Sequence, residues 1–135
     1  MRKIEKIIVH WSANVNSTCS SIRSYHKNVR GYKDIGYHYV IERNAVVKIG
    51  RSIDQVGAHC KGYNVGSVGV CVVADPDNPP TPFQISSLQS LIVDLIINFD
   101  LDWSDVWCHS DFAKTECPGE LLRQFVHYPF KFEYD

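Results

Sequence analysis

Residues 65–74 read VGSVGVCVVA, the most strand-like stretch of the chain. Valine carries a branched β-carbon that favours extended backbone, so this run predicts a strand. Gly66 and Gly69 interrupt the run and leave room for another group to approach one face of the strand closely. The segments on either side of this strand decide the fold class.

Strand and helix patterns alternate along the rest of the chain. Apolar, β-branched runs predict strands over residues 3–11, 36–43, 45–50 and 105–108. Helical spacing of apolar residues predicts helices over residues 18–30 and 82–99, and a last helix that begins at Pro118-Gly119. This order predicts an α/β fold, a single domain over residues 1–135 with a central mixed sheet of about five strands flanked by about three helices.

The charge balance and hydropathy exclude several classes of protein. Lysine and arginine number 14 against 15 aspartates and glutamates, so we expect no nucleic-acid partner. No apolar run approaches the roughly 20 residues of a membrane-spanning helix. The run Ile7–Val9 is shorter than the ~7–15-residue core of a secretion signal, so we expect synthesis and retention in the cytoplasm. We also expect a monomer.

The five cysteines stand at positions 19, 60, 71, 108 and 117. An odd number without a secretion signal argues against a disulfide framework. Cys71 and Cys108 lie in or beside apolar runs, where cysteine acts as a small buried hydrophobe. Cys117 differs because it lies in a loop that Pro118 makes rigid.

Chemistry-bearing side chains follow the first and last predicted strands. His10 and His109 stand where these strands end, and Cys117 lies eight residues beyond His109. Open α/β sheets build their sites at strand ends, and two imidazoles with a thiolate suit a zinc ion that keeps one position for water. On spacing alone, the alternative that these are ordinary surface residues or satisfied ones stays open. Six histidines and five cysteines allow many such triples.

The remaining histidines have other interpretations. His26 falls on the apolar stripe of a predicted helix and is expected to pack there, and His127 has no evident partner. His59 lies in the glycine-punctuated loop over residues 57–64, which is either a binding loop or a solvated one.

Several strings together, in order along nearly the whole chain, resemble one family. They are IIVHWSA (7–13), GYHYVI (36–41), GAHCKGYN (57–64), SVGVC (67–71), HSD (109–111) and TECPG (115–119). This set is similar to the zinc-dependent N-acetylmuramoyl-L-alanine amidases of the superfamily that includes phage lysozymes and peptidoglycan recognition proteins. The resemblance implies hydrolysis of the amide bond between the lactyl group of N-acetylmuramic acid and the L-alanine of the stem peptide in peptidoglycan.

The resemblance also implies a set of site residues. His10, His109 and Cys117 match the ligands of one Zn²⁺ ion, and Tyr37 matches a tyrosine needed for catalysis. Thr115 stands where the phage lysozymes have a lysine, as in many peptidoglycan recognition proteins that retain amidase activity.

Five further side chains are expected around the reaction site. Lys114 lies next to Thr115, and either could assist the oxyanion. The side chains expected to bind the substrate are His59, Lys61, Asn64 and Lys114. Asp111 either orients a ligand or caps a turn.

The alternative function with the same fold is a non-catalytic module that recognises muropeptides. The presence of Cys117 and Tyr37 argues against it. A zinc peptidase acting within the stem peptide and a regulator acting on a partner protein are two further possibilities. The expected lack of a secretion signal fits a phage endolysin that acts on the wall after release, and also fits a cytosolic enzyme that recycles wall fragments.

Overall fold

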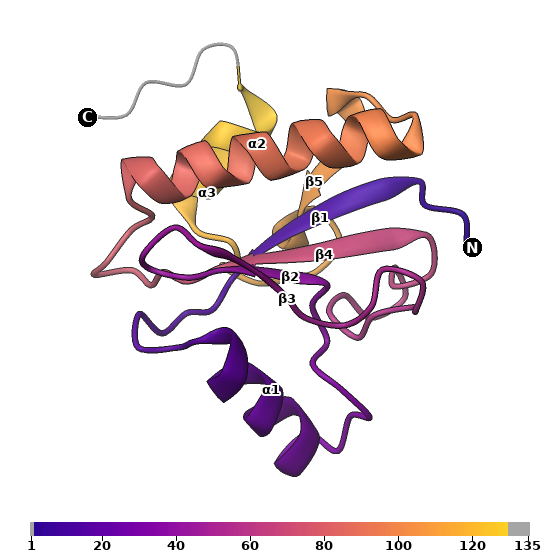
Figure 1. Ribbon diagram of the computed structural model, residues 1–135. Coiled ribbons are helices and arrows are strands. Elements are labelled where there is room, and N and C mark those ends of the chain that lie inside the picture. Colours follow the sequence, from indigo (N-terminus) through magenta and orange to yellow (C-terminus); the bar gives the residue numbers. More distant parts are fainter. Residues whose placement is uncertain (1, 130–135) are drawn as a thin grey trace.

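A five-stranded sheet with the order β3-β2-β4-β1-β5 forms the centre of the computed structural model, which describes residues 2–129 (Figure 1). Every pairing is parallel except that of β2 with β3, so the predicted mixed sheet is confirmed. The strands are β1 (Lys6–Trp11), β2 (Tyr39–Ile41), β3 (Val47–Ile49), β4 (Ser67–Val72) and β5 (Val106–Cys108).

Three helices cover the sheet, α1 on one face and α2 and α3 on the other (Figure 1). They are α1 (Cys19–Asn28), α2 (Pro82–Phe99) and α3 (Glu120–His127), with short 3-10 turns η1 (Trp103–Asp105) and η2 (His109–Asp111) around β5. Thr81 and Gln84 form the predicted capping box at the start of α2. Within residues 2–129, none of the helices combines the length and the apolar character that a bilayer crossing requires.

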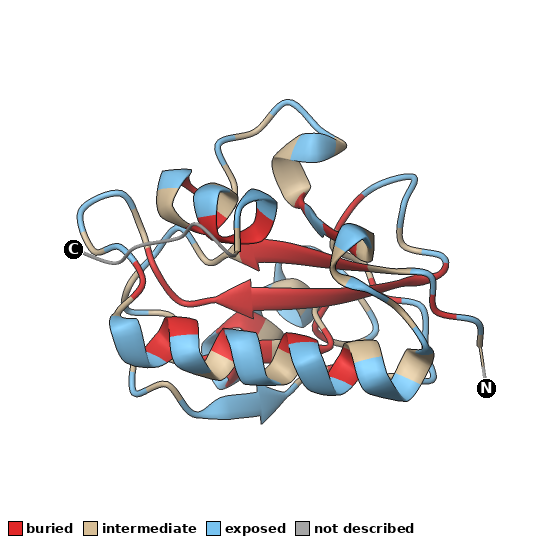
Figure 2. Cartoon of the chain, turned by 90° about the horizontal axis from the view of Figure 1, so that it is seen from above, coloured by how far each residue is buried: buried red, intermediate tan, exposed pale blue. Residues whose placement is uncertain are grey.

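Strand β4 is buried along its whole length (Figure 2). Its side chains alternate between the two faces, as the period of a strand requires. Val68, Val70 and Val72 join the core beneath α2 and α3. Cys71, and Val73 directly after the strand, join a smaller cluster beneath α1. Each fully buried valine or leucine contributes about 1.5–3 kcal/mol, so the larger core dominates the stability of the fold.

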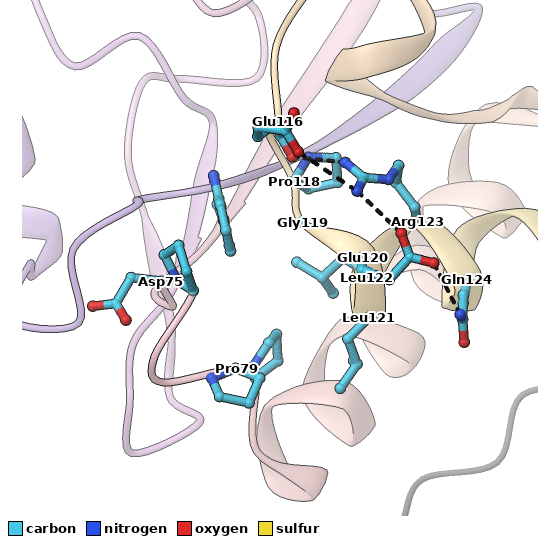
Figure 3. Close-up of a pocket in the computed structure, with 13 residues that line it drawn as sticks. Asp75, Pro79, Glu116, Pro118, Gly119, Glu120, Leu121, Leu122, Arg123 and Gln124 are labelled. Atoms are coloured by element: carbon cyan, nitrogen blue, oxygen red, sulfur yellow. Dashed lines mark hydrogen bonds and ion pairs between the residues drawn. The ribbon is translucent and has the colours of Figure 1, made fainter.

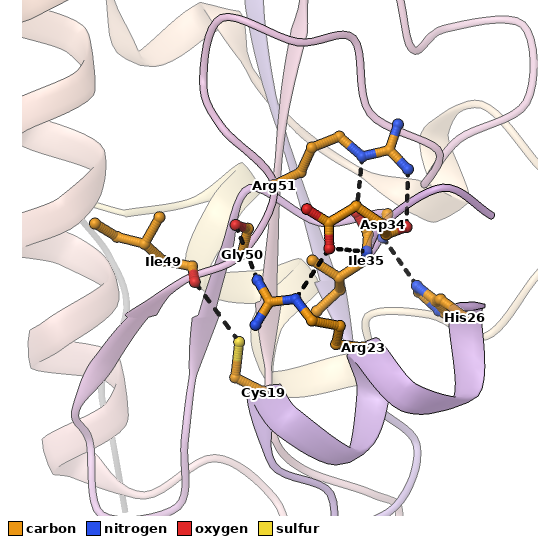
Figure 4. A network of polar contacts seen from close by, with 9 residues as sticks. Cys19, Arg23, His26, Asp34, Ile35, Ile49, Gly50 and Arg51 are labelled. Atoms are coloured by element: carbon orange, nitrogen blue, oxygen red, sulfur yellow. Dashed lines mark hydrogen bonds and ion pairs between the residues drawn. The ribbon is translucent and has the colours of Figure 1, made fainter. Parts of the chain in front are cut away.

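Strand β2 is shorter than the predicted strand over residues 36–43, because the backbone before it pairs with loops. The carbonyl of Gly36 accepts from the N–H of Ala58, and that of Tyr37 accepts from the N–H of Arg51. The buried Arg51 side chain also donates to the carbonyls of Asp34 and Ile35 (Figure 4). These bonds hold the segment that carries Tyr37 against the end of the sheet.

The topology opens a crevice at the carboxyl end of β1. Strand β1 leads to α1 on one face, whereas its neighbours β4 and β5 lead to α2 and α3 on the other (Figure 1). Connections that leave adjacent strands in opposite directions leave space between them at the sheet edge. The strand ends that carry His10 and His109 therefore meet at this crevice.

All five cysteines are free, with Cys71 and Cys108 fully buried, as expected. The expectation that His127 lacks a partner is wrong, because its Nε2 lies 3.0 Å from the Asp111 carboxylate. Helix α3 packs back onto the end of β5, and this contact is not encoded in local spacing.

His38 is a buried histidine that stays neutral. It is 1% exposed, and its Nδ1 accepts from the N–H of Gly69 at 3.0 Å. Burial, with a smaller contribution from the charge of Arg2, lowers the pKa of His38 to about 4. The unfolded chain takes up this proton near pH 6.5, whereas the folded chain does so only near pH 4.

We therefore expect the free energy of unfolding to fall as pH drops from about 7 to about 5, by up to about 1.4 kcal/mol per pH unit for this residue. Urea unfolding at the two pH values measures it. His38→Gln should flatten the dependence relative to wild type. An equally steep curve in the variant would remove His38 as a cause.

Candidate metal centre

His10 and His109 lie side by side at the carboxyl edge of the sheet. His10 is the penultimate residue of β1 and is 1% exposed, and His109 begins η2 directly after β5. The ring centroids are 4.6 Å apart. Because β1 and β5 run parallel and are neighbours, their ends deliver the two imidazoles to one place.

Cys117 completes the cluster. Its Sγ accepts a hydrogen bond from the backbone N–H of Trp11 at 3.3 Å and lies 3.8 Å from Nδ1 of His10. One ligand atom from each of His10, His109 and Cys117 lies within 4.8 Å of the others. The structure thus brings together the three residues that the sequence singled out.

These donors fit a zinc ion. With bond lengths of about 2.0–2.3 Å, two ligands of one tetrahedral zinc lie about 3.3–3.8 Å apart. The separation of 3.8 Å between Cys117 Sγ and His10 Nδ1 is close to that range. Three protein ligands also leave one coordination position for another group.

The electrostatics keep the cluster neutral before a cation binds. Burial, reinforced by His59 and His109, lowers the pKa of His10 well below its ordinary value, and burial lowers the pKa of His109. Burial raises the pKa of the Cys117 thiol to about 12, although the Trp11 N–H opposes this shift. Neutral imidazoles offer lone pairs to a metal, and a bound cation would displace the thiol proton.

Tyr37 stands beside the cluster. Its ring centroid is 5.1 Å from that of His10, and its hydroxyl interacts with the Cys71 thiol. Burial raises the pKa of Tyr37 well above its ordinary value, so the hydroxyl keeps its proton and can donate a hydrogen bond.

Thr115 and Lys114 differ in their surroundings. The Thr115 hydroxyl accepts from the N–H of Cys117 at 3.2 Å, which fixes the turn before the thiol. Lys114 is exposed. Asp111 caps the turn at the N–H of Cys108, which is the capping alternative of its two expected roles.

A hollow of about 570 Å³ opens beside the cluster. It is lined by His109, Tyr37 and the loop that carries His59, Lys61 and Asn64. A second hollow of about 480 Å³ shares Tyr37, His26 and Arg30 with it, so the two form one groove along α1.

The residues of the 57–64 loop have different roles in this groove. Lys61 is exposed, whereas the Asn64 side chain accepts from the backbone N–H groups of His59 and Cys60 and fixes the loop. His59 extends beneath His10, with 2.8 Å between His59 Nδ1 and His10 Nε2. His26 does not only pack, because its Nδ1 accepts from the N–H of Gly36 and the residue lines the groove.

A third hollow of about 580 Å³ is lined by Glu116 and Pro118, the two chain neighbours of Cys117 (Figure 3). Trp11, Pro79 and Leu121 give it an apolar wall. None of His10, His109 and Tyr37 lines it. The groove along α1 is therefore the one that adjoins the candidate metal centre.

The prediction that Gly66 and Gly69 allow a close approach is right for Gly69 only. A Cβ on Gly69 would lie 2.6 Å from the His59 ring, so this glycine does allow a close approach. A Cβ on Gly66 would make only ordinary contacts, at 3.7 Å or more, but the residue has a positive φ of 78°, so the chain uses its conformation and not its small size.

A contact that the sequence does not reveal joins Gly119 to Trp11. Gly119 has φ 91° and ψ 163°, and a Cβ there would lie 2.6 Å from the Trp11 ring. Only the Pro118-Gly119 pair hints at a special turn.

Comparison with known proteins identifies relatives among amidases and phage endolysins. The family described as N-acetylmuramoyl-L-alanine amidase matches residues 1–120. An endolysin of Klebsiella phage KP32 is 38% identical over 133 residues, which cover 92% of this chain and 86% of that protein.

Two solved structures have the same fold. The amidase LysC from Clostridium intestinale is 31% identical, with a TM-score of 0.82 over 88% of this chain and 78% of that one. Drosophila PGRP-LB, solved as a tyrosine-to-phenylalanine mutant in complex with tracheal cytotoxin, is 25% identical, with a TM-score of 0.84 over 99% of this chain and 86% of that one.

We expect Gly119→Ala to destabilise the fold more than Gly31→Ala. Both glycines have positive φ, but nothing lies within 4 Å of a Cβ on Gly31. Gly31→Ala should cost about 1 kcal/mol through backbone strain, and the clash with Trp11 should add about 1–3 kcal/mol at Gly119. Urea unfolding monitored by tryptophan fluorescence measures both, and equal losses would contradict a packing role for Gly119.

Proposed function

Because the chain belongs to the N-acetylmuramoyl-L-alanine amidase family, we propose that it is a zinc-dependent amidase of the phage endolysin type. Its reaction is hydrolysis of the amide bond between the lactyl group of N-acetylmuramic acid and L-alanine in peptidoglycan. The observation that carries this proposal is the convergence of His10, His109 and Cys117 at the edge of an open groove.

His10, His109 and Cys117 would hold the zinc ion. Bound there, zinc would supply a Lewis acid for the scissile carbonyl and lower the pKa of water to make a nucleophile at neutral pH. The protein contributes the neutral state of the imidazoles and the Trp11 N–H, which stabilises the Cys117 thiolate.

Tyr37 and Thr115 donate hydrogen bonds to the reacting amide. The Tyr37 ring adjoins that of His10 and its hydroxyl keeps its proton, so it can donate to the oxyanion that develops on the carbonyl. One such donor lowers the barrier by about 3–4 kcal/mol. The Thr115 hydroxyl already accepts from the Cys117 N–H, which leaves its own proton to donate. The ammonium of Lys114, the preceding residue, is the alternative group that would assist the oxyanion.

The substrate lies in the groove along α1. Lys61 on its rim offers a cation to the carboxylates of the stem peptide, and His59 and Asn64 form the wall behind it. The complex of PGRP-LB with tracheal cytotoxin supports a muropeptide ligand for this fold. As with the endolysin relatives, the place of action is the cell wall after release from the cytoplasm.

Digestion of purified sacculi tests the reaction. We expect free stem peptides that begin with an L-alanine amine in product mass spectra. Peptides cut within the stem would indicate a peptidase instead, and binding without products would indicate a recognition module.

Cys117→Ser should lose bound zinc, measured by atomic absorption, because a hydroxyl replaces the thiolate ligand. Turnover should fall on the order of 10²–10³-fold, the loss of several kcal/mol of transition-state stabilisation. Cys19→Ser is the matched control, since that buried cysteine is the first residue of α1 and its thiol contacts the Ile49 carbonyl. Wild-type protein that purifies without zinc and ignores chelators would contradict the metal proposal.

Tyr37→Phe keeps the ring and removes the hydroxyl. We expect zinc content to stay at the wild-type level while kcat falls about 10²–10³-fold. The measurement pairs atomic absorption with steady-state kinetics on a muropeptide. Near-normal kcat with full zinc would remove Tyr37 from the mechanism.

A further inference from the structure

The His59 imidazole lies directly behind His10. His10 directs Nδ1 toward Cys117, at 3.8 Å from Sγ, and Nε2 toward His59, at 2.8 Å from Nδ1. Two ring nitrogens this close share one proton, so one histidine donates and the other accepts. Which of them donates decides whether His10 has a lone pair on the side of Cys117.

The far end of the chain of hydrogen bonds indicates the direction. His59 Nε2 lies 3.1 Å from the Ser67 hydroxyl oxygen, and that hydroxyl donates to the Asn64 carbonyl at 3.2 Å. The Ser67 hydroxyl has one proton and the Asn64 carbonyl can only accept, so both bonds form together only when Ser67 donates to the carbonyl. The Ser67 oxygen then accepts from His59 Nε2–H, which leaves His59 Nδ1 as the acceptor for His10 Nε2–H.

The opposite arrangement would block the candidate metal centre. If Ser67 donated to His59, then His59 Nδ1–H would donate to His10 Nε2, and the neutral His10 would carry its proton on Nδ1. That nitrogen faces Cys117 and would have no lone pair for a metal. The hydrogen-bond acceptor at Asn64 therefore selects the tautomer of a residue two rings away.

We propose that His59 is a positioning residue that fixes His10 in its Nε2–H tautomer and aims the Nδ1 lone pair at the metal site. The inference rests on the proposed zinc-binding function. It differs from the substrate-binding role expected from the sequence, because both ring nitrogens of His59 already contact protein groups.

The surroundings of His59 match this role. A Cβ on Gly69 would lie 2.6 Å from the ring, and one on Gly57 would lie 2.9 Å from Cδ2, so the ring fills a slot that two glycines keep open. The backbone N–H of His59 donates to the Asn64 side chain at 2.9 Å. The ring therefore has little freedom to turn away from His10.

Two variants at position 59 separate the hydrogen bond from ring packing. His59→Phe keeps a ring but cannot accept from His10, whereas the side-chain oxygen of His59→Asn can take the place of Nδ1. We expect the zinc dissociation constant, measured by competition with a chelator, to rise about 10–100-fold in His59→Phe. His59→Asn should recover most of this loss.

The tautomer itself can be read in the metal-free protein. Long-range ¹H–¹⁵N spectra of the histidine rings should show His10 protonated at Nε2 in wild type. Ser67→Ala removes the group that orients His59, so the spectra should show a mixture of His10 tautomers. This variant keeps the test decisive if His59→Phe does not fold, which far-ultraviolet circular dichroism checks.

The outcomes distinguish this inference from the proposed function. The positioning role is overturned if His59→Phe binds zinc as tightly as wild type does, or if folded Ser67→Ala shows the same His10 tautomer as wild type. Either outcome leaves the amidase proposal standing. Lack of zinc affinity in wild type overturns the zinc proposal, whatever tautomer His10 adopts.

Discussion

The parallel pairing of β1 with both β4 and β5 is the constraint on which the rest of the site depends. It places the ends of β1 and β5 at one edge of the sheet, so that residues 99 positions apart in sequence, His10 and His109, have ring centroids 4.6 Å apart. The N–H of Trp11, one residue beyond His10, then anchors the Cys117 thiol. A register shift of one residue in β1 would turn His10 to the opposite face, into the core beneath α2 and α3.

Burial is the second constraint, and its consequences differ from one group to the next. A buried polar group without a partner costs about 1–3 kcal/mol, so each ring nitrogen of this cluster needs a partner or a metal. His10 and His59 meet this need through each other and through Ser67. The same burial that makes charged imidazoles unfavourable leaves them neutral, which is the state that a metal requires. At the histidines, desolvation favours the neutral imidazole that a metal binds. At Cys117, desolvation favours the neutral thiol, whereas a metal requires the thiolate.

Local patterns in the sequence were enough for the sheet and the helices, but they left His10, His109 and Cys117 as one of many possible triples, and the family resemblance singled them out. Strand runs and capping boxes act over a few residues, and strand ends of an α/β fold carry sites, so local patterns could mark His10 and His109 only as candidates. The position of His59 could not be predicted, because the 57–64 loop belongs to no strand and is held by the Asn64 side chain. The contact of Gly119 with Trp11 and the pair of His127 with Asp111 also join distant segments, and no spacing rule encodes them.

The two faces of the sheet divide stability from chemistry. The larger apolar core lies beneath α2 and α3, whereas α1 covers a smaller cluster that includes Cys71 and Val73. Because α1 shields only part of its face, the groove that contains Tyr37 stays open beside it. A cross-linked wall polymer cannot enter a closed cavity, so an enzyme that cuts it needs such a surface groove. The stability that α2 and α3 provide on the opposite face allows the α1 face to hold buried histidines, glycine-lined slots and polar loops that contribute little to the core.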